Sequence, residues 1–477
     1  MRVSLAVLAS ALTLQVAQGY GILGHTFTGQ IAQLLLTHET ARQIKDILSP
    51  YYDGLLSKAA PWPDTIKMRP QYRWATVLHY VNTPGDNPPD DCRFEYSSNR
   101  RDVVNGIFNM TATLLHYQAN PPKSSRSPPP PRSIELERQY DDDAWFLAGS
   151  GLSNRDINNN NDDDDQDDDS DKVDRSIRED ALRFFVHFMG DLHQPLHTAG
   201  KARGGNDAPA RWRRAKTNLH RIWDGQLIMK DIKDNFDNDP KAYLDSIMEL
   251  TTTFWAPSAN WSTCDPDVIA NELVDNPWAT ALQPSSPSSS SSTNHHKHTV
   301  LHHLCPKAWA REMNALACEY AWEGYHQGRN PSEDQDMSEG HYFDRATDRD
   351  HGYLVRRLLA MSGVRMAAIL NAIFDPERPS EDDLVHLAAS RPWRSSSSSS
   401  LSSMESRFRH LRRPLSGYYQ TVQWLRDWIQ QAEQDGEGDH HAGCSDYDDD
   451  YAVDSMDHVE EGQQAGRAPQ RPFVLQL

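Results

Sequence analysis

The sequence predicts an all-α fold for residues 20–374, and two observations lead to this prediction. Apolar residues recur at helical spacing in several segments. No segment alternates apolar and polar residues as a set of half-buried strands would. Because the chain has 477 residues, of which 38% are hydrophobic, it can form a sizeable core. We therefore expect one helical body with low-complexity segments attached to it.

The first 19 residues have the pattern of a secretory signal peptide. Arg2 precedes an apolar run over residues 3–14, and small residues stand one and three positions before Tyr20. We therefore expect the mature chain to begin at Tyr20 and to be secreted to the extracellular space. No later run reaches the roughly 18 to 20 apolar residues of a transmembrane helix, so we expect no membrane association.

The first half of the body is predicted to contain short helices and one long insertion. Residues 30–36 and 41–48 have helical apolar spacing, and proline-rich turns separate such segments up to residue 116. Residues from about 118 to 176 are rich first in proline and then in asparagine and aspartate. This composition indicates a solvated low-complexity insertion.

A second insertion is expected over residues 283–303, which are rich in serine and then in histidine. A histidine tract can bind metal, but solvated low complexity is the favoured interpretation. Helical periodicity returns over residues 309–322 and 353–374. The tail, residues 375–477, is serine-rich and acidic and is predicted to be largely disordered, with one possible amphipathic helix at 417–429.

The formal net charge of −20 argues against binding of nucleic acid through a basic patch. Much of the excess lies in the aspartate-rich runs 161–171 and 445–450. Such blocks are usually solvated and disordered. The total charge therefore says little about the surface at which the protein acts.

Cysteines and glycosylation sequons fit the expected secretory route. Five cysteines in an oxidising compartment suggest two disulfides and one remaining thiol, for which Cys444 in the tail is the natural candidate. The sequons at Asn109 and Asn260 are predicted glycosylation sites.

The run His-Phe-Met-Gly-Asp-Leu-His-Gln-Pro-Leu-His, residues 187–197, concentrates metal ligands in an apolar context. His187 and Asp191 are four residues apart, so on a helix their side chains leave one face about 6 Å apart and can hold one ion. Pro195 ends that helix, so His197 can point back toward the same place. His220 and Asp224 repeat the four-residue spacing.

The competing interpretation of each histidine is a hydrogen-bonded core residue, which is the commoner role of a lone buried histidine. Five ligand-type residues that converge by pattern favour a metal site. His193 lies off the face that His187 and Asp191 share, and we interpret it as a structural residue.

Three further candidates lie nearer the amino terminus. His25 follows Tyr20 by five residues, and the α-amine made by cleavage, with a pKa of about 7.7 to 8.0, can lose its proton and coordinate a metal. Asp64 in Trp-Pro-Asp and His79 in Leu-His-Tyr add a carboxylate and an imidazole in aromatic settings.

Together these motifs resemble the S1/P1 family of zinc-dependent single-strand nucleases. The matching motifs run from Tyr20 to about Phe374 and agree in order, spacing and flanking residues: Tyr-Gly-Ile-Leu-Gly-His, Trp-Pro-Asp, His-Tyr, residues 187–197, Gly204-Gly205-Asn206, Thr-Asn-Leu-His-Arg-Ile-Trp-Asp and residues 309–314. The resemblance implies a compact helical fold of the phospholipase C and nuclease type around a cleft with three zinc ions.

The resemblance also implies roles for single residues. The implied ligands are, for one zinc, Asp64, His79, His187 and Asp191; for a second, the amine and carbonyl of Tyr20, His25 and a bridging Asp191; for the third, His197, His220 and Asp224. Lys67 matches a cation near the scissile phosphate and, with Asp64 and Asp191, is an implied catalytic residue. The implied substrate-binding residues are Tyr80, Asn82, Gly205 and Asn206. By resemblance Cys92 pairs with Cys318, which leaves Cys264 with Cys305.

Two departures from the family pattern bear on these roles. The family usually begins with Trp where this chain has Tyr20; coordination through the backbone survives that change, but packing of the indole does not. The family usually has Phe and Asp in the base pocket, where this chain has Tyr80 and Asn82. Tyr80 can still stack on a base, whereas Asn82 is expected to alter base preference.

The implied activity is hydrolysis of single-stranded DNA and RNA to 5′-phosphorylated products, with 3′-nucleotidase activity as well. Zinc lowers the pKa of bound water to about 7, which supplies a hydroxide nucleophile. We expect a monomer without a protein partner. Two alternatives stay open: a phospholipase C-type phosphodiesterase, which would need an exposed apolar rim, and a non-catalytic secreted metal-binding protein, which chelator-sensitive turnover would exclude.

Overall fold

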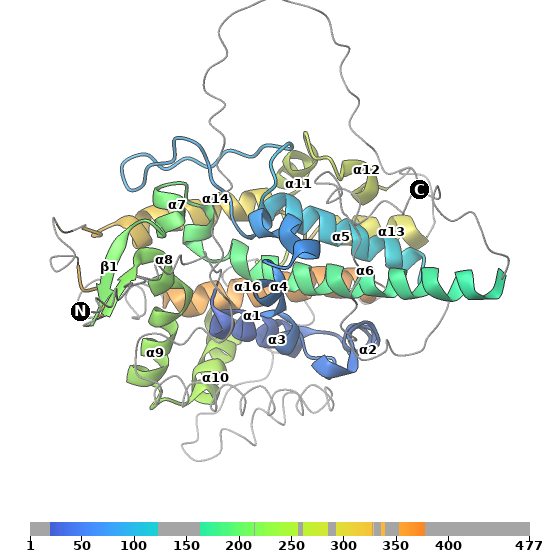
Figure 1. Ribbon diagram of the computed structural model, residues 1–477, viewed down its shortest axis with the longest axis horizontal. Helices are drawn as coiled ribbons and strands as arrows, with labels where there is room; N and C mark the ends of the chain where they lie inside the picture. Colours follow the sequence, from blue (N-terminus) through green and yellow to red (C-terminus); the bar gives the residue numbers. More distant parts are fainter. Residues whose placement is uncertain are drawn as a thin grey trace, which may run out of the picture.

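A computed structural model of the chain describes residues 20–122, 163–213, 215–255, 261–284, 292–326, 328, 335–338 and 353–376. The predicted all-α fold is confirmed (Figure 1). The α-helices up to the long α6 are α1 (Ile22–Leu35), α2 (His38–Ile47), α3 (Leu56–Ala59), α4 (Trp62–Ile66), α5 (Val103–Ala119) and α6 (Asp163–Leu192). Short 3-10 segments join them: η1 (Pro50–Tyr52), η2 (Pro70–His79) and η4 (Pro195–Thr198).

In the described residues of its second half, the body is also helical except for one short ribbon. Its α-helices are α7 (Ala202–Gly205), α8 (Leu219–Arg221), α9 (Leu227–Asn235), α10 (Pro240–Leu250), α11 (Pro266–Leu273), α12 (Ala279–Leu282), α13 (Ser292–Leu301), α14 (Pro306–Leu316) and α16 (Leu354–Phe374). Single π-helical turns are η5 (Ile222–Gln226), η6 (Thr251–Trp255) and η7 (Ala317–Trp322). Strands β1 (Pro209–Trp212) and β2 (Ala215–Asn218) pair antiparallel. Four-residue strands are too short for their alternation to be recognised in the sequence.

Helices α1, α6 and α16 lie side by side in the middle of the body, and α5 packs on α6 (Figure 1). An added Cβ on Gly363 of α16 would collide with Ile31 of α1, so this glycine lets the two helices approach closely. Helix α16 contributes its first half to one hydrophobic cluster and its second half to another. It therefore joins the two cores of the body.

Among the described residues, α16 is the one helix long and apolar enough to cross a membrane, with a mean hydropathy of 1.4 over its best window. Since 94% of that window is buried inside the protein, α16 is explained as a core helix. The periodicity predicted over residues 353–374 is confirmed by this helix, and that over 309–322 by α14 and η7.

The first insertion is shorter than the sequence suggested. Helix α5 extends to Ala119, and α6 begins at Asp163, within the aspartate-rich run. The Tyr117 hydroxyl donates to Asp174 Oδ1 at 3.0 Å, which ties α5 to a part of α6 that was expected to belong to the insertion. The expected start near residue 118 agrees with the end of α5, whereas the expected end at 176 is wrong, and residues 123–162 lie outside the described residues.

The second insertion is also corrected. Helix α13 begins at Ser292, and its end buries Val300 and Leu301 against the core. His303, which follows the helix, is 8% exposed, and its Nδ1 lies 2.5 Å from the carbonyl oxygen of Ser262. The prediction of solvated low complexity is wrong for residues 292–303. Val300 and Leu301 anchor this segment in the core, although the serines and histidines around them have the composition of a solvated segment. The tail beyond residue 376, with the helix expected at 417–429 and Cys444, lies outside the described residues.

Both implied disulfides are confirmed. Cys92 pairs with Cys318, and Cys264 pairs with Cys305, each with a Cα–Cα distance of 6.2 Å. The first joins residues 226 positions apart and ties the loop after η2 to the turn after α14.

The glycosylation site expected at Asn109 is wrong. Asn109 lies in the middle of α5 and is 1% exposed, so a glycan on its Nδ2 has no path to solvent. The second sequon, at Asn260, lies outside the described residues.

Candidate metal centre

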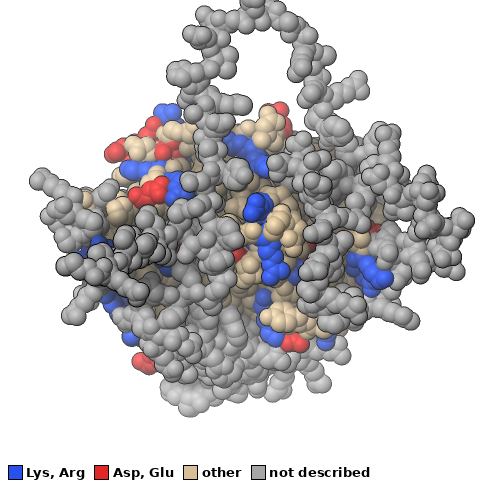
Figure 2. Space-filling model, viewed as in Figure 1, with Lys and Arg blue, Asp and Glu red and all other residues tan. Residues whose placement is uncertain are grey.

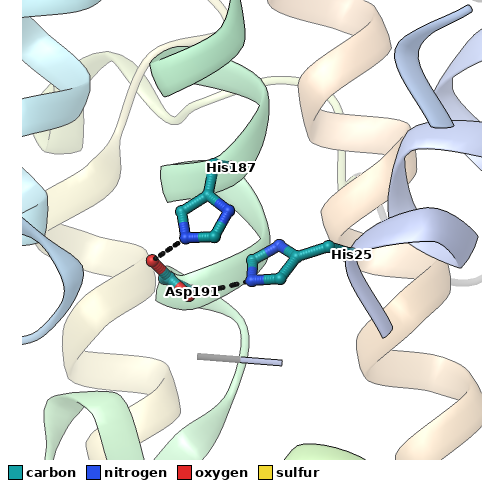
Figure 3. A group of neighbouring side chains, drawn as sticks. All are labelled: His25, His187 and Asp191. Atoms are coloured by element: carbon teal, nitrogen blue, oxygen red, sulfur yellow. Dashed lines mark ion pairs between the residues drawn. The ribbon is translucent and has the colours of Figure 1, made fainter. Parts of the chain in front are cut away.

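Asp191 stands between two imidazoles that come from different helices (Figure 3). On α6, His187 Nε2 lies 3.1 Å from Asp191 Oδ2, so the predicted four-residue pair is formed. From α1, His25 Nε2 lies 3.3 Å from Asp191 Oδ1. An added Cβ on Gly190 would lie 2.7 Å from His25 Nδ1, so this glycine leaves the space that the His25 ring occupies. All three polar residues are fully buried.

Two further residues complete a neighbouring group on the same carboxylate. Helix α4 brings in Asp64, and the end of η2 brings in His79. His79 Nδ1 lies 3.0 Å from Asp191 Oδ2, and His187 Nε2 lies 3.6 Å from Asp64 Oδ1. Lys67, at the end of α4, is 2% exposed and places its Nζ 3.1 Å from Asp64 Oδ1. The predicted cation is therefore part of the buried centre.

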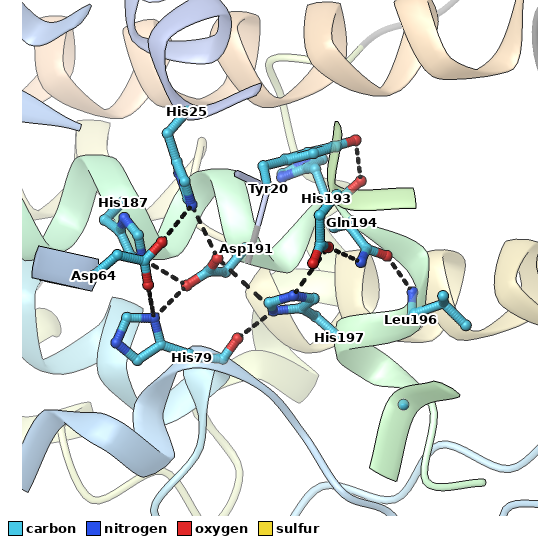
Figure 4. Close-up of polar contacts among 12 residues, drawn as sticks. Tyr20, His25, Asp64, His79, His187, Asp191, His193, Gln194, Leu196 and His197 are labelled. Carbon is cyan, nitrogen blue, oxygen red and sulfur yellow. Dashed lines mark hydrogen bonds and ion pairs between the residues drawn. The ribbon is translucent and has the colours of Figure 1, made fainter. Parts of the chain in front are cut away.

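The third group combines residues from η4, α8 and η5. His220 Nε2 lies 3.5 Å from Asp224 Oδ2, and His197 Nε2 lies 4.0 Å from Asp224 Oδ1. His197 Nδ1 also lies 3.7 Å from Asp191 Oδ1, which places this group beside the other two (Figure 4). The structure thus brings together all eight side chains that the sequence suggested as metal ligands: His25, Asp64, His79, His187, Asp191, His197, His220 and Asp224.

Backbone carbonyls orient three of the imidazoles. Nδ1 of His187 lies 2.7 Å from Ala60 O, and Nδ1 of His220 lies 2.7 Å from Gly204 O. Nδ1 of His197 likewise lies 2.6 Å from the carbonyl oxygen of residue 79. Because a carbonyl oxygen only accepts, this network assigns a proton to Nδ1 in each ring and directs Nε2 at the group.

The donor atoms fit divalent metal ions. In three groups the candidate ligand atoms all lie within 4.8 Å of one another. Among the described residues, no hydrogen bond is made by either ring nitrogen of His25, by Nε2 of His79 and His197, or by Oδ1 of Asp191, although all are buried. Buried polar atoms without a partner are costly. Imidazole nitrogen and carboxylate oxygen are the ligands of zinc sites. Bound zinc would satisfy Nε2 of His25, Nε2 of His197 and Oδ1 of Asp191, each of which faces another member of its group.

The electrostatics of the centre also call for added positive charge. Burial would lower the pKa of His187, but Asp191 and Asp64 outweigh burial and raise it to about 10. Burial, reinforced by the charges of Asp64 and Asp191, raises the pKa of Asp224 well above its ordinary value. Without a metal, the protein therefore holds protons on His187 and Asp224. A bound cation would instead balance the charge of the three buried carboxylates.

The segment that begins at Tyr20 is fixed beside the third group. Tyr20 is 1% exposed, and its hydroxyl donates to the carbonyl oxygen of His193 at 3.0 Å. Gly21 N donates to the backbone oxygen of Asp224 at 3.0 Å. His193 itself uses Nδ1 on Met189 O and places Nε2 3.0 Å from Arg365, and it belongs to none of the three groups. This agrees with its predicted structural role.

The residues predicted to form a base pocket flank the third group. Tyr80 is half-buried and Asn82 is exposed, and between them Val81 N donates to His197 O at 2.6 Å. Gly205 is buried with a φ of +85°, and Asn206 is half-buried and donates to Arg203 O. The first segment thus contacts His197 and the second lies next to His220; the pocket itself stays a prediction.

Gln194 is a residue of the centre that sequence reasoning missed. Its Nε2 donates to Asp224 Oδ1 at 2.6 Å, and its Oε1 accepts from Leu196 N at 2.6 Å. It therefore holds the third carboxylate against η4. The only sequence signal is its position inside the histidine-rich run, since nothing in the residue type indicates which partner it has.

The chain is similar to known nucleases over most of its length. The S1/P1 Nuclease family model matches residues 20–128 and 157–375. Endonuclease 1 of Arabidopsis thaliana is 28% identical over 369 residues, which are 74% of this chain and 87% of the relative. Nuclease S1 of Aspergillus oryzae is 25% identical over 369 residues, 76% of this chain and 96% of the relative. Nuclease P1 of Penicillium citrinum is 22% identical over 301 residues, which are 63% of this chain and 80% of the relative.

Proposed function

Because this chain belongs to the S1/P1 nuclease family and is thus a hydrolase of phosphodiester bonds in nucleic acids, we propose that it is a secreted endonuclease of single-stranded DNA and RNA. It leaves the phosphate on the 5′ end of its products and also removes phosphate from 3′-nucleotides. The observation that carries this proposal is the set of three adjoining buried groups in which imidazole nitrogens and carboxylate oxygens lie within reach of one metal ion each.

The family is zinc-dependent, and we assign one zinc to each group. Asp64, His79, His187 and Asp191 would hold the first, His25 with Asp191 and the Tyr20 backbone the second, and His197, His220 and Asp224 the third. When bound, zinc supplies a hydroxide near neutral pH and neutralises charge on the phosphate. Asp191 would contribute to both of the first two groups, since its two carboxylate oxygens face different imidazoles.

The chain's own part in the reaction is to bind and orient the phosphodiester. In the proposed displacement the water oxygen bonds to phosphorus, the P–O3′ bond breaks, and the 3′ oxygen leaves and takes up a proton. Lys67 is a buried cation 3.1 Å from Asp64. We assign it to the phosphate oxygens, where charge develops, because a fixed cation in a buried site stabilises that charge strongly.

Cleavage after Gly19 is part of the proposal, because it would make the Tyr20 amine available as a ligand. The family match begins at residue 20. The contacts of Tyr20 with His193 and of Gly21 with Asp224 hold this segment beside the metal groups. Two disulfides support passage through an oxidising compartment, and hence secretion.

Preference for single strands follows from the proposed base pocket of Tyr80, Asn82, Gly205 and Asn206. A base must leave its stack before its face can rest on the Tyr80 ring. Since Tyr80 is half-buried and Asn82 exposed, both can meet a base at the surface of the protein. Asn82 offers an amide in place of a carboxylate, so base preference is the property in which we expect this chain to differ from its relatives.

The structure favours a nuclease over a phospholipase. Among the described residues the exposed large apolar side chains are Tyr51, Val173 and Val274, which come from three separate segments and form no rim for lipid. A non-catalytic role is disfavoured because the buried cation Lys67 and all eight side-chain ligands are present.

The proposal is tested by digestion of single-stranded DNA and RNA with the purified mature protein, with and without EDTA, followed by identification of the product ends. We expect chelator-sensitive release of 5′-phosphorylated nucleotides from both. Failure of the zinc-replete protein to cleave either substrate would contradict the proposal, and short-chain phospholipids would then be the next substrates to test.

A further inference from the structure

A second cleft lies near the metal centre, on the side of the disulfide Cys92–Cys318. One wall is the segment Cys92–Glu95, and the other is the face of α14 that carries Arg311, Asn314 and Ala315. Its volume is about 340 Å³, and it is open to solvent. This size admits one nucleotide-sized ligand.

Two hydrogen-bonded connections fix the cleft relative to the metal centre. Asn314 is 4% exposed, and its Nδ2 donates to Thr198 O at 2.9 Å. Asp86, which is 6% exposed, accepts from Arg93 N at 2.9 Å with one oxygen and from Gly200 N at 2.7 Å with the other. Hydrogen bonds therefore link both walls to Thr198 and Gly200, which follow the metal-ligand candidate His197 in the sequence.

The disulfide joins the two walls to each other. Cys92 begins the first wall, and its partner Cys318 lies in η7, which continues α14. A bound chain would thus meet a preformed surface, which reduces the ordering that binding requires.

The side chains of the cleft have the chemistry that recognises a nucleotide. Phe94 is half-buried and packs against the hydrophobic core, and the exposed Arg311 lies over its ring, with Cζ 5.9 Å from the ring centroid. Among the described residues no carboxylate forms an ion pair with Arg311. Burial raises the pKa of Glu272 and the charge of Arg311 lowers it slightly, but the two side chains form no ion pair. An aromatic face beside an available guanidinium suits a base stacked next to its phosphate.

The other charged groups restrict what the cleft can hold. Arg93 is already engaged by Asp91, with Nη2 2.8 Å from Oδ2, and Glu95 adds an exposed carboxylate to the wall. The cleft therefore lacks the dense positive charge that a duplex backbone requires. Figure 2 shows Lys and Arg side chains near the middle of the described surface, and Asp and Glu side chains beside Lys and Arg at its upper left.

We propose that this cleft is an additional nucleotide subsite for the substrate strand, in which a base stacks on Phe94 and its phosphate contacts Arg311. The proposal rests on the proposed function, because it assigns to the cleft a nucleotide of the strand whose scissile phosphate lies at the metal centre. A paired base cannot present its face to Phe94, so the subsite adds to the preference for single strands.

The test compares hydrolysis of single-stranded oligonucleotides of 2 to 12 nucleotides with that of a 3′-mononucleotide, which in this proposal occupies the metal centre alone. Loss of base stacking in Phe94→Ala should raise KM for the longer oligonucleotides by roughly fivefold or more. Phe94→Trp can still stack on a base, so its KM should stay at the wild-type value. In Arg311→Ala the slope of log KM against the logarithm of salt concentration should fall by the amount that about one phosphate contact contributes. Hydrolysis of the mononucleotide should not change in any variant.

Arg42→Ala is the matched control, because Arg42 is an exposed arginine on α2 that already pairs with Glu39 and Asp46. Unchanged KM at every length in Phe94→Ala and Arg311→Ala would overturn the subsite, as would an equal loss on the mononucleotide. If neither the wild type nor any variant hydrolyses a substrate, the proposed function fails. The subsite is then tested by affinity for a hydrolysis-resistant phosphorothioate 12-mer. Phe94→Ala should weaken this affinity, and equal affinity of variant and wild type would refute the subsite.

Discussion

The hydroxyl of Tyr20 donates a hydrogen bond to the carbonyl oxygen of His193, 3.0 Å away and fully buried. The bond joins the expected first residue of the mature chain to the turn that separates the ligands of α6 from those of η4. The Tyr20 ring also packs on Gly24, where an added Cβ would lie 2.7 Å from Tyr20 Cβ. Tyr20 is thus held by both ends of its side chain, although it stands where the family usually has Trp.

Tyr20→Phe should weaken the second zinc site without removing any ligand. The variant leaves the carbonyl of His193 without its donor, which costs about 1–3 kcal/mol for a buried group. We expect a lower melting temperature and faster loss of one zinc to a competing chelator. Equal zinc retention in variant and wild type would show that the hydroxyl does not position the amine.

An added residue before Tyr20 should remove the amine ligand. The α-amine becomes an amide, which does not coordinate zinc at neutral pH. We expect one zinc fewer per chain and loss of most activity, measured on protein whose amino terminus is confirmed by sequencing. An extended form with full zinc content and full rate would show that the amine is not a ligand.

Gly190→Ala should disrupt the approach of α1 to α6. The added Cβ would lie 2.7 Å from His25 Nδ1, so the His25 ring or the helix must move, at a cost of about 1–3 kcal/mol. We expect both lower stability in chemical denaturation and lower zinc affinity. Gly225→Ala is the control, because nothing lies within 4 Å of its added Cβ; similar behaviour of the two variants would refute the packing argument.

Asp102 should make stability depend on pH. It caps the amino terminus of α5 by accepting from Asn105 N, and burial raises its pKa from 3.8 to about 7. Between these values the folded state keeps a proton that the unfolded state has released, so stability falls as pH rises from about 4 to 7. Below pH 4 this contribution is fully present, and above pH 7 it is lost.

Asp102→Asn isolates this effect, because asparagine is also a good cap but cannot ionise. Relative to wild type, the variant should gain on the order of 3 kcal/mol in unfolding free energy between pH 4 and 7. The measurement is urea denaturation at several pH values. A difference between the two proteins that does not vary with pH would show that Asp102 titrates normally in the folded state.

Apolar periodicity predicted the helices that line the core, because their buried faces repeat over three or more turns. Helix α16 is the clearest case, whereas α13 was missed because only Val300 and Leu301 anchor a segment of serine and histidine. The same limit applies to Asn109, whose sequon carries no sign that its helix is buried on all sides.

Spacing alone could place His187 with Asp191, since both lie on one helix face. It could not show that Asp64 and His79, from two other segments, meet the same carboxylate; that followed from the resemblance to a known family. Gln194 was missed altogether, because a hydrogen bond between η4 and η5 depends on how the chain folds back after Pro195.

The number of zinc ions per chain in the active, mature protein tests the central claim most directly. Inductively coupled plasma mass spectrometry on a weighed sample should give three, one for each buried group of histidine and aspartate. A protein that hydrolyses single-stranded DNA at full rate with no zinc bound would contradict the account.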